Sequence, residues 1–305
     1  MTIHIQTPLI ESLSVGKNLQ AKVWLKMEAL QPCGSFKARG VGFACSQYAA
    51  EGATEFISSS GGNAGLAVAY SGRCLKVPVT VVVPVTTKQK AIDLMEQEGA
   101  TVVVHGSIWI EAHQHAMSLA QKGAVYIHPF DDPYLWEGHA SLIDEVKAAG
   151  VRPDVIVLSV GGGGLLSGVV AGLQRNDWQD IPILAVETKG ADSLAVAAVA
   201  KEHIGLSAIS SIATSLGATK VAGQAFSLLR EYSISPLVVS DKQAVDACLS
   251  FLDQHRVLVE PACGASLAAV YQQSEILLNK KNILVIVCGG VGATVEQLNQ
   301  WSDSL

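Results

Sequence analysis

The chain has 305 residues, of which 49% are hydrophobic and 16% charged, with a formal net charge of −6 at pH 7. This length suits about two domains of roughly 100–200 residues, and the apolar content excludes an intrinsically disordered chain. Positive charge is not clustered, so nucleic-acid binding is not expected. The longest apolar runs, such as Val79–Pro84 and Ile283–Cys288, are far shorter than the roughly 20 residues of a membrane-spanning helix.

Short β-branched runs alternate with longer segments of helical spacing. The predicted strands are Lys22–Met27, Glu55–Ser59, Val79–Pro84, Thr101–His105, Val155–Val160, Ile183–Val186, Leu237–Val239 and Ile283–Val287. The predicted helices are Phe36–Glu51, Gly62–Leu75, Thr87–Glu98, Ile108–Lys122, Leu135–Ala149, Leu165–Gln174, Gly217–Tyr232, Asp241–Gln254 and Gly264–Leu278. This alternation predicts βαβ units and an α/β fold whose mainly parallel sheets are covered by helices on both faces.

Two interruptions of this pattern predict a division into two lobes. The first is Gln31-Pro32, and the second is Pro129–Pro133, a cluster of chain breakers and polar residues. We therefore expect a large domain of residues 1–32 and 134–305 and a small domain, residues 33–133, inserted into it. The six cysteines include no C-x-x-C pair and no signal peptide is visible, so free thiols and a cytoplasmic location are expected.

Four consecutive glycines, Gly161–Gly164, follow the predicted strand Val155–Val160 and precede a predicted helix. Such a loop presents free N–H groups and the positive end of a helix dipole, which is typical of a phosphate site. The dinucleotide pattern G-x-G-x-x-G is not met, because Ser167 stands at its last position. Glu187 nevertheless follows at about the 20-residue distance of a ribose-binding acid. A nicotinamide-dependent dehydrogenase that uses Gly161–Gly164 therefore stays open as an alternative.

Two further segments stand at the ends of predicted strands. Ser58–Gly65 offers small side chains, backbone donors and the amide of Asn63, which suit a carboxylate and a hydroxyl group. Cys288 ends the last predicted strand and is followed by two glycines. Ligands of parallel sheets bind outside the carboxyl ends of the strands. One ligand that bridges these two segments and the Gly161–Gly164 loop is therefore predicted.

Lys37 lies among small residues at the start of the predicted helix Phe36–Glu51. A helix N-terminus and burial would both disfavour its positive charge. Its pKa would then fall, and its amine could form a Schiff base or act as a base. On this motif alone, a solvated surface lysine is the alternative.

Taken together and in order, these motifs resemble the fold-type II pyridoxal-phosphate enzymes, and most closely the L-serine/L-threonine dehydratases. The motifs that carry the resemblance are Ser35–Gly40, Ser59–Gly65, Gly161–Gly164 and Cys288–Gly290, with further matches at Thr7–Leu9, Val186–Thr188 and Glu260–Gly264. The resemblance spans nearly the whole chain. It implies a tryptophan synthase β-like fold with two lobes, each a mainly parallel twisted sheet flanked by helices, and a homodimer.

The resemblance also implies roles for individual residues. Lys37 would be the catalytic residue and would hold pyridoxal 5'-phosphate as the internal aldimine. The other cofactor-binding residues would be Phe36, Asn63 at the ring 3′-oxygen, Cys288 at the pyridine nitrogen, and Gly161, Gly162, Gly163, Gly164 and Leu165 around the phosphate. The substrate carboxylate would contact Ser60, Gly62, Asn63 and Ala64. A monovalent cation such as potassium would lie near Glu187, Ala191, Leu216 and Ala218.

The implied reaction is β-elimination from L-serine or L-threonine through an aminoacrylate, which yields ammonia and pyruvate or 2-oxobutyrate. Gly61 stands where the serine racemases of this fold have a serine that acts as a base, so efficient racemisation is not expected. A racemase or sulfhydrylase relative and a non-catalytic amino-acid sensor stay as alternatives. The sequence does not rank serine against threonine, because one methyl group gives only about 1–3 kcal/mol of discrimination.

Overall fold

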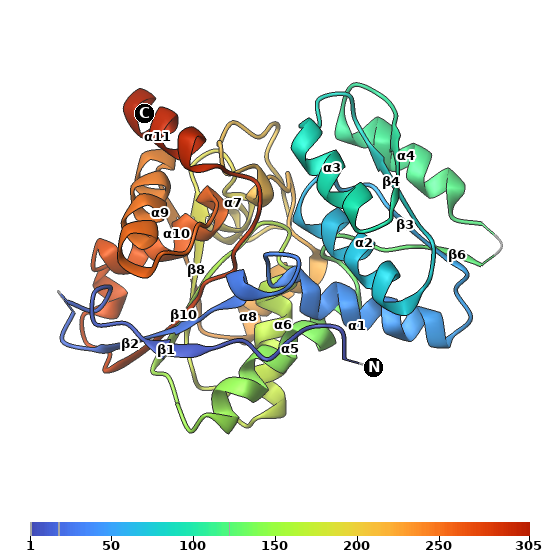
Figure 1. Ribbon diagram of the computed structural model, residues 1–305. Helices are drawn as coiled ribbons and strands as arrows, with labels where there is room; N and C mark the ends of the chain where they lie inside the picture. The colour runs from blue at the N-terminus through green and yellow to red at the C-terminus, as the bar shows by residue number, and fades with distance from the viewer. Residues whose placement is uncertain (1, 18, 122) are drawn as a thin grey trace.

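The computed structural model describes residues 2–17, 19–121 and 123–305, which form ten strands and eleven α-helices (Figure 1). The strands are β1 (Leu9–Glu11), β2 (Lys22–Lys26), β3 (Glu55–Ser58), β4 (Val79–Val83), β5 (Thr101–Val104), β6 (Ala124–Tyr126), β7 (Val155–Ser159), β8 (Ile183–Thr188), β9 (Ile234–Val239) and β10 (Asn282–Ile286). The helices are α1 (Lys37–Ala50), α2 (Asn63–Leu75), α3 (Gln89–Gln97), α4 (Trp109–Leu119), α5 (Pro133–Ala148), α6 (Gly164–Arg175), α7 (Ser193–Ala200), α8 (Gly223–Glu231), α9 (Asp241–His255), α10 (Pro261–Tyr271) and α11 (Val295–Ser304).

The strands form two separate sheets. The larger has the order β1-β2-β10-β7-β8-β9 and is parallel except for the antiparallel pair of β1 and β2. The smaller has the order β5-β4-β3-β6 and is parallel throughout. In Figure 1 the smaller sheet and helices α2, α3 and α4 lie on one side of the molecule, and the larger sheet lies on the other. The predicted α/β class with mainly parallel sheets is confirmed.

All strands of the smaller sheet come from residues 55–126, within the predicted small domain. Helix α1 packs against both α2 and α5. The domain boundaries at residues 32/33 and 133/134 stay a prediction. Within the described ranges, no helix combines the length and the apolar character needed to span a membrane.

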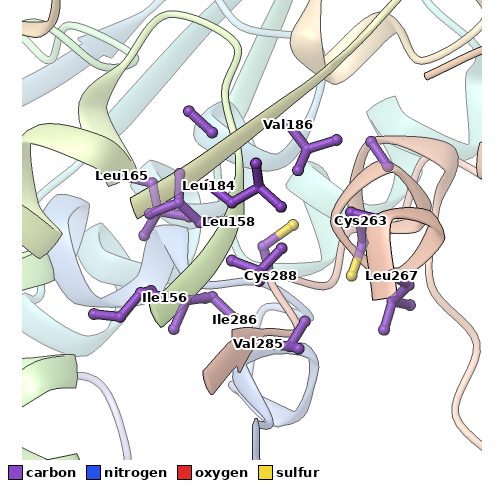
Figure 2. Packing of buried hydrophobic residues seen from close by; sticks show 14 of the residues in the cluster. Ile156, Leu158, Leu165, Leu184, Val186, Cys263, Leu267, Val285, Ile286 and Cys288 are labelled. Carbon is purple, nitrogen blue, oxygen red and sulfur yellow. The ribbon is translucent and has the colours of Figure 1, made fainter. Parts of the chain in front are cut away.

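The central strands of the larger sheet are buried on both faces. Val155–Leu158 of β7 and Ile283–Ile286 of β10 have at most 1% exposure, as expected for continuous apolar strands in a covered parallel sheet. Figure 2 shows Leu158, Val186 and Ile286 in the same packed cluster as the thiols of Cys288 and Cys263. This packing holds Cys288 rigidly beyond the carboxyl end of β10.

Four elements are not predicted by the sequence pattern: β1, β6, α7 and α11. The two strands have three residues each, too short for an alternating pattern to be visible. Helix α10 begins at Pro261 instead of Gly264, because proline is favoured in the first turn of a helix, and it ends at Tyr271. Helix α8 begins at Gly223, not Gly217. Helix α4 ends at Leu119, and its predicted end, Lys122, lies outside the described residues.

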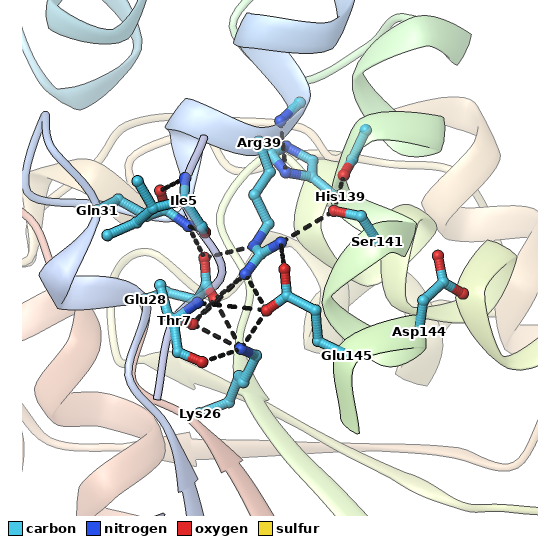
Figure 3. Close-up of polar contacts among 12 residues, drawn as sticks. Ile5, Thr7, Lys26, Glu28, Gln31, Arg39, His139, Ser141, Asp144 and Glu145 are labelled. Atoms are coloured by element: carbon cyan, nitrogen blue, oxygen red, sulfur yellow. Dashed lines mark hydrogen bonds and ion pairs between the residues drawn. The ribbon is translucent and has the colours of Figure 1, made fainter. Parts of the chain in front are cut away.

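A buried ion-pair network fixes the first turn of α1 (Figure 3). The guanidinium of Arg39 is fully buried and donates to two carboxylates. Its Nε and Nη2 bind Oε2 and Oε1 of Glu28 at 2.7 and 2.8 Å, and its Nη1 and Nη2 bind Oε1 and Oε2 of Glu145, both at 2.7 Å. Such bidentate pairs are strong and restrict the geometry. Helix α1 is thereby joined to α5 and to the turn after β2.

Lys26 and Thr7 complete the same network. Lys26 Nζ binds Glu145 and donates to Thr7 Oγ1 at 2.7 Å, while the Thr7 hydroxyl donates to Glu28 Oε1 at 2.6 Å. Two cations thus face two carboxylates, and their formal charges cancel. The network also accounts for the Thr7–Leu9 motif, because the Thr7 hydroxyl bridges the ions and connects the N-terminal segment to α1.

We expect Arg39→Met to lower the free energy of unfolding by about 3–5 kcal/mol, because it leaves the buried Glu28 and the largely buried Glu145 with one cation. Arg152→Met is the matched control. Arg152 pairs with Asp180 on the surface, with side chains 51% and 68% exposed, so its loss should cost less than about 1 kcal/mol. Urea unfolding of the cofactor-free protein measures both changes. Equal destabilisation of the two variants would contradict this account of the network.

Candidate active site

The segment before Lys37 is attached to the end of the central strand β10. The amide of Phe36 donates to the carbonyl of Cys288 at 3.1 Å, and Ser35 pairs with Gly289 in an isolated antiparallel bridge. Lys37 itself is the first residue of α1. Two motifs from opposite ends of the chain therefore meet at the carboxyl edge of the larger sheet, as the strand-end rule predicts.

The amine of Lys37 lies inside the protein rather than in solvent. Its Nζ donates to the carbonyl of Pro129 and lies 5.1 Å from the centre of the Phe36 ring. Burial lowers the pKa of Lys37 from 10.5 to about 8, against the opposing effect of Cys288. A substantial fraction of this amine is therefore neutral near physiological pH, which a nucleophile or a general base requires. A half-buried lysine whose amine is hydrogen-bonded to a backbone carbonyl does not fit the alternative of a solvated surface lysine.

Cys288 supplies an uncharged polar group beside this amine. Its side chain is 6% exposed. A hydrogen bond with Cys263 and burial together raise the pKa of Cys288 well above its usual value. The group is therefore a neutral thiol, which is a weak hydrogen-bond donor.

The loop Gly161–Gly164 connects β7 to α6 and has no room for side chains. A β-carbon at Gly162 would lie 2.2 Å from Cγ of Phe130, and one at Gly163 would lie 2.3 Å from Cβ of Ala225. Gly163 also has a φ of 90°, which favours glycine. The first amides of a helix have no partner within the helix and carry the positive end of its dipole. The loop therefore presents backbone donors at the start of α6, an arrangement that suits an anion such as a phosphate.

We expect Gly162→Ala to weaken pyridoxal-phosphate binding by at least about tenfold, because the methyl group would push Phe130 and the loop apart. Gly223→Ala is the matched control. Gly223 opens α8, and a β-carbon there meets only His203, at 3.9 Å. Titration of the cofactor-free protein, followed by absorption of the bound cofactor, gives both affinities. Unchanged affinity for Gly162→Ala would exclude the loop from the site.

The loop before α2 brings Asn63 to the same place. A β-carbon at Gly65 would lie 1.9 Å from the carbonyl oxygen of Ser60, so only glycine lets α2 approach the loop this closely. The Ser60 hydroxyl accepts from the amide of Gly62 at 3.3 Å. Asn63 Nδ2 donates to Ser215 Oγ at 3.3 Å. The Ser215 backbone borders Gly161, so the loop before α2 and the Gly161–Gly164 loop are neighbours.

The predicted cation residues lie on the β8–α7 connection and at the turn around Leu216. Both oxygens of Glu187 accept amide hydrogens of α7, from Leu194 and Ala195, at 2.8 Å each. Burial raises the pKa of Glu187 to about 8. Because Glu187 caps α7, it is not free to bind a ribose, which removes the acid that the dehydrogenase alternative needs. The cation site at Glu187, Ala191, Leu216 and Ala218 stays a prediction.

Residues of the site that the sequence does not indicate are Pro129, Phe130 and Ser215. The pattern of Pro129–Pro133 predicts only a domain boundary. In the structure, the Pro129 carbonyl accepts from Lys37 and the Phe130 ring lies against Gly162. Every residue has a backbone carbonyl, and a ring that only fills space belongs to no motif, so neither contact can be predicted from residue types. Only the proximity of the chain breakers to a domain boundary, where ligand sites often form, could have indicated them.

Comparison with known proteins assigns the chain to a family. The model of a family described as pyridoxal-phosphate dependent enzymes matches residues 1–289. The chain is 45% identical to L-serine dehydratase of Dictyostelium discoideum, over 99% of this chain and 93% of the relative. It is 46% identical to the human L-serine dehydratase/L-threonine deaminase, over 99% and 96%. A fungal L-serine ammonia-lyase from Rhizomucor miehei superposes with a TM-score of 0.95, at 34% identity over 99% of both chains.

The chain therefore belongs to the pyridoxal-phosphate dependent enzymes, and its fold is that of fold-type II. This confirms the resemblance inferred from the motifs. It also favours pyridoxal phosphate over a nicotinamide dinucleotide as the cofactor of this chain.

The pKa of Lys37 can be measured in the cofactor-free protein. We expect acylation of Lys37, followed by mass spectrometry of its peptide, to show a midpoint near pH 8, against about 10.4 for an ordinary lysine. Between these values the folded amine is neutral while the unfolded one is charged. The wild type should therefore gain stability relative to Lys37→Met as the pH rises from about 8 to 10.5. A midpoint above pH 10 would contradict burial of the amine.

Proposed function

We propose that this protein catalyses β-elimination from L-serine and L-threonine and releases a 2-oxo acid and ammonia. The observation that carries the proposal is the Lys37 amine, with a pKa of about 8, held beside the neutral thiol of Cys288 at one strand end. The names of the similar proteins, L-serine dehydratase and L-serine dehydratase/L-threonine deaminase, support the same reaction.

The residues present fit pyridoxal phosphate. The loop Gly161–Gly164, together with Leu165, would bind its phosphate through backbone amides at the start of α6. Asn63 would donate an N–H to the ring 3′-oxygen, and Cys288 would face the ring nitrogen. The Phe36 ring lies near the amine of Lys37 and the ring of His139, where it would support the cofactor. When bound, the cofactor supplies an aldehyde for the substrate amine and an electron sink.

Protein groups would bind the substrate and move its proton. The carboxylate would contact Ser60, Gly62, Asn63 and Ala64, where α2 begins and its first amides and dipole favour an anion. The neutral amine of Lys37 would remove the α-proton, since its lowered pKa leaves the lone pair free at working pH. The β-hydroxyl group would then leave together with a proton, as water, which gives an aminoacrylate. Water would add to the α-carbon of its imine form and release ammonia and the 2-oxo acid.

Two residues favour elimination over related reactions. Cys288 is neutral, so it does not hold the ring nitrogen protonated as an aspartate would in a transaminase. Gly61 carries no side chain that could act as a second base. A β-carbon there would also lie 2.9 Å from both Oγ1 and Cγ2 of Thr87, so the space is already occupied. These features support elimination rather than racemisation.

The test is a substrate panel with a matched pair of variants. We expect the wild type to release 2-oxo acid from L-serine and L-threonine, and far less from D-serine or O-acetylserine. Lys37→Ala should lose the visible absorption of the bound cofactor and about 10²- to 10⁴-fold of the rate. Lys90→Ala, at an exposed position of α3, should retain both. A colourless wild type, or turnover of the D-isomers alone, would refute the proposal.

Three further features belong to this proposal. The resemblance implies a monovalent cation such as potassium near Glu187 and a homodimer, and the cysteine pattern favours a cytoplasmic location. The substrate panel in potassium and in tetramethylammonium buffers tests the cation, and sedimentation equilibrium tests the dimer.

A further inference from the structure

We propose that Glu260 is a positioning residue whose carboxylate decides which end of the Asn63 amide faces the cofactor. The inference rests on the proposed function, in which Asn63 contacts the ring 3′-oxygen. It also explains the motif Glu260–Gly264, to which the resemblance assigns no role. Glu260 immediately precedes α10 and is 4% exposed.

Four groups form one chain of hydrogen bonds between the two sheets. The amide of Val291 donates to Asn63 Oδ1 at 3.0 Å. Asn63 Nδ2 donates to Glu260 Oε1 at 2.8 Å. The amide of Gly292 donates to Glu260 Oε2 at 2.8 Å. Asn63 begins α2, which packs on the smaller sheet, whereas the other three residues follow β10 or precede α10.

Both ends of this chain are backbone N–H groups, which can only donate. A side-chain amide between them has one accepting end and one donating end. The remaining member must therefore accept on both of its atoms, and among side chains only an ionised carboxylate does so. With Glu260 in that place, the Asn63 oxygen must face Val291 and its nitrogen must face Glu260.

Space around Glu260 is arranged for this group. A β-carbon at Gly290 would lie 2.1 Å from Cδ of Glu260, and one at Gly292 would lie 2.6 Å from Oε2. Both glycines are thus needed for the loop to close around the carboxyl group. Burial raises the pKa of Glu260, while hydrogen bonds from Ser215, Gly292 and Asn63 and the charge of Lys88 oppose that shift.

The orientation of Asn63 leaves one N–H for a ligand. Its second amide hydrogen points to the hydroxyl of Ser215, an exposed side chain, at the longer distance of 3.3 Å. Ser215 borders Gly161. An anionic ring oxygen beside the Gly161–Gly164 loop would replace this weaker partner, whereas an inverted amide would present its oxygen and repel the ring oxygen.

A double-mutant cycle tests the hydrogen-bond chain without any cofactor. In Glu260→Gln, the new side chain can accept from only one of Asn63 and Gly292, so two donors face each other at the other contact. In Asn63→Asp, two carboxyl groups face each other. The variant that carries both changes closes the chain again, because the new side-chain amide at position 260 can donate to the new carboxylate at position 63 and accept from Gly292. We therefore expect each single variant to unfold at lower urea concentration than the wild type and the double variant to recover most of the loss. Independent, additive losses would overturn the proposed chain.

Cofactor affinity then separates positioning from structural support. Glu260→Gln should weaken pyridoxal-phosphate binding by about tenfold or more, because a misplaced or unpaired buried donor is costly. In the double variant, the affinity for pyridoxal phosphate should stay at least about tenfold below that of the wild type although the stability recovers. The reason is that position 63 then presents an oxygen to the ring oxygen. Glu231→Gln, at an exposed end of α8, should change neither quantity.

Recovery of affinity together with stability in the double variant would reduce Glu260 to a structural role and overturn the positioning proposal. Wild-type affinity in Glu260→Gln would do the same. Failure of the proposed function gives a different result. The wild type would then bind no pyridoxal phosphate, while the unfolding cycle would still show coupling between positions 63 and 260.

Discussion

The site depends on the attachment of the first turn of α1 to the carboxyl end of β10. Pairing of residues 35–36 with residues 288–289 places an amine and a neutral thiol side by side. The Arg39 network fixes the same turn from its other side, against α5 and the turn after β2. Only a rigidly held turn can keep Lys37 out of water, and this burial lowers its pKa. The reactivity of the amine is therefore a consequence of how α1 is attached.

Buried charge is accommodated in two different ways around this turn. Arg39, Lys26, Glu28 and Glu145 neutralise one another directly, so the group carries no net formal charge. Glu187 and Glu260 instead receive their hydrogen bonds from amides, mostly of the backbone. These amide partners lower the pKa of each carboxyl group, against the burial that raises it, without adding positive charge near Lys37. They also fix the donor and acceptor ends of each hydrogen bond, because an N–H group can only donate.

Local patterns allowed the sheets and the main site residues to be predicted. Buried parallel strands are continuous apolar runs. Asn63, Gly161–Gly164 and Cys288 follow the ends of such runs, whereas Lys37 stands at the start of a predicted helix. The role of Glu260 and the contacts of Pro129 and Phe130 could not be predicted in this way. Their partners are distant in sequence, and carbonyl groups, aromatic rings and shape complementarity leave no motif. The strands β1 and β6 escaped prediction because pairing, not pattern, defines three-residue strands.

Asn63 has a consequence for the molecule as a whole. The same side chain contacts the loop after β10, the start of α10 and the position proposed for the cofactor ring. The same hydrogen bonds would therefore hold the smaller sheet against the larger one and bind the coenzyme. By reciprocity, the factor by which docking of the two sheets would strengthen coenzyme binding equals the factor by which bound coenzyme would strengthen the docking. Loading of the coenzyme is in this sense also an assembly step between the two halves of the fold.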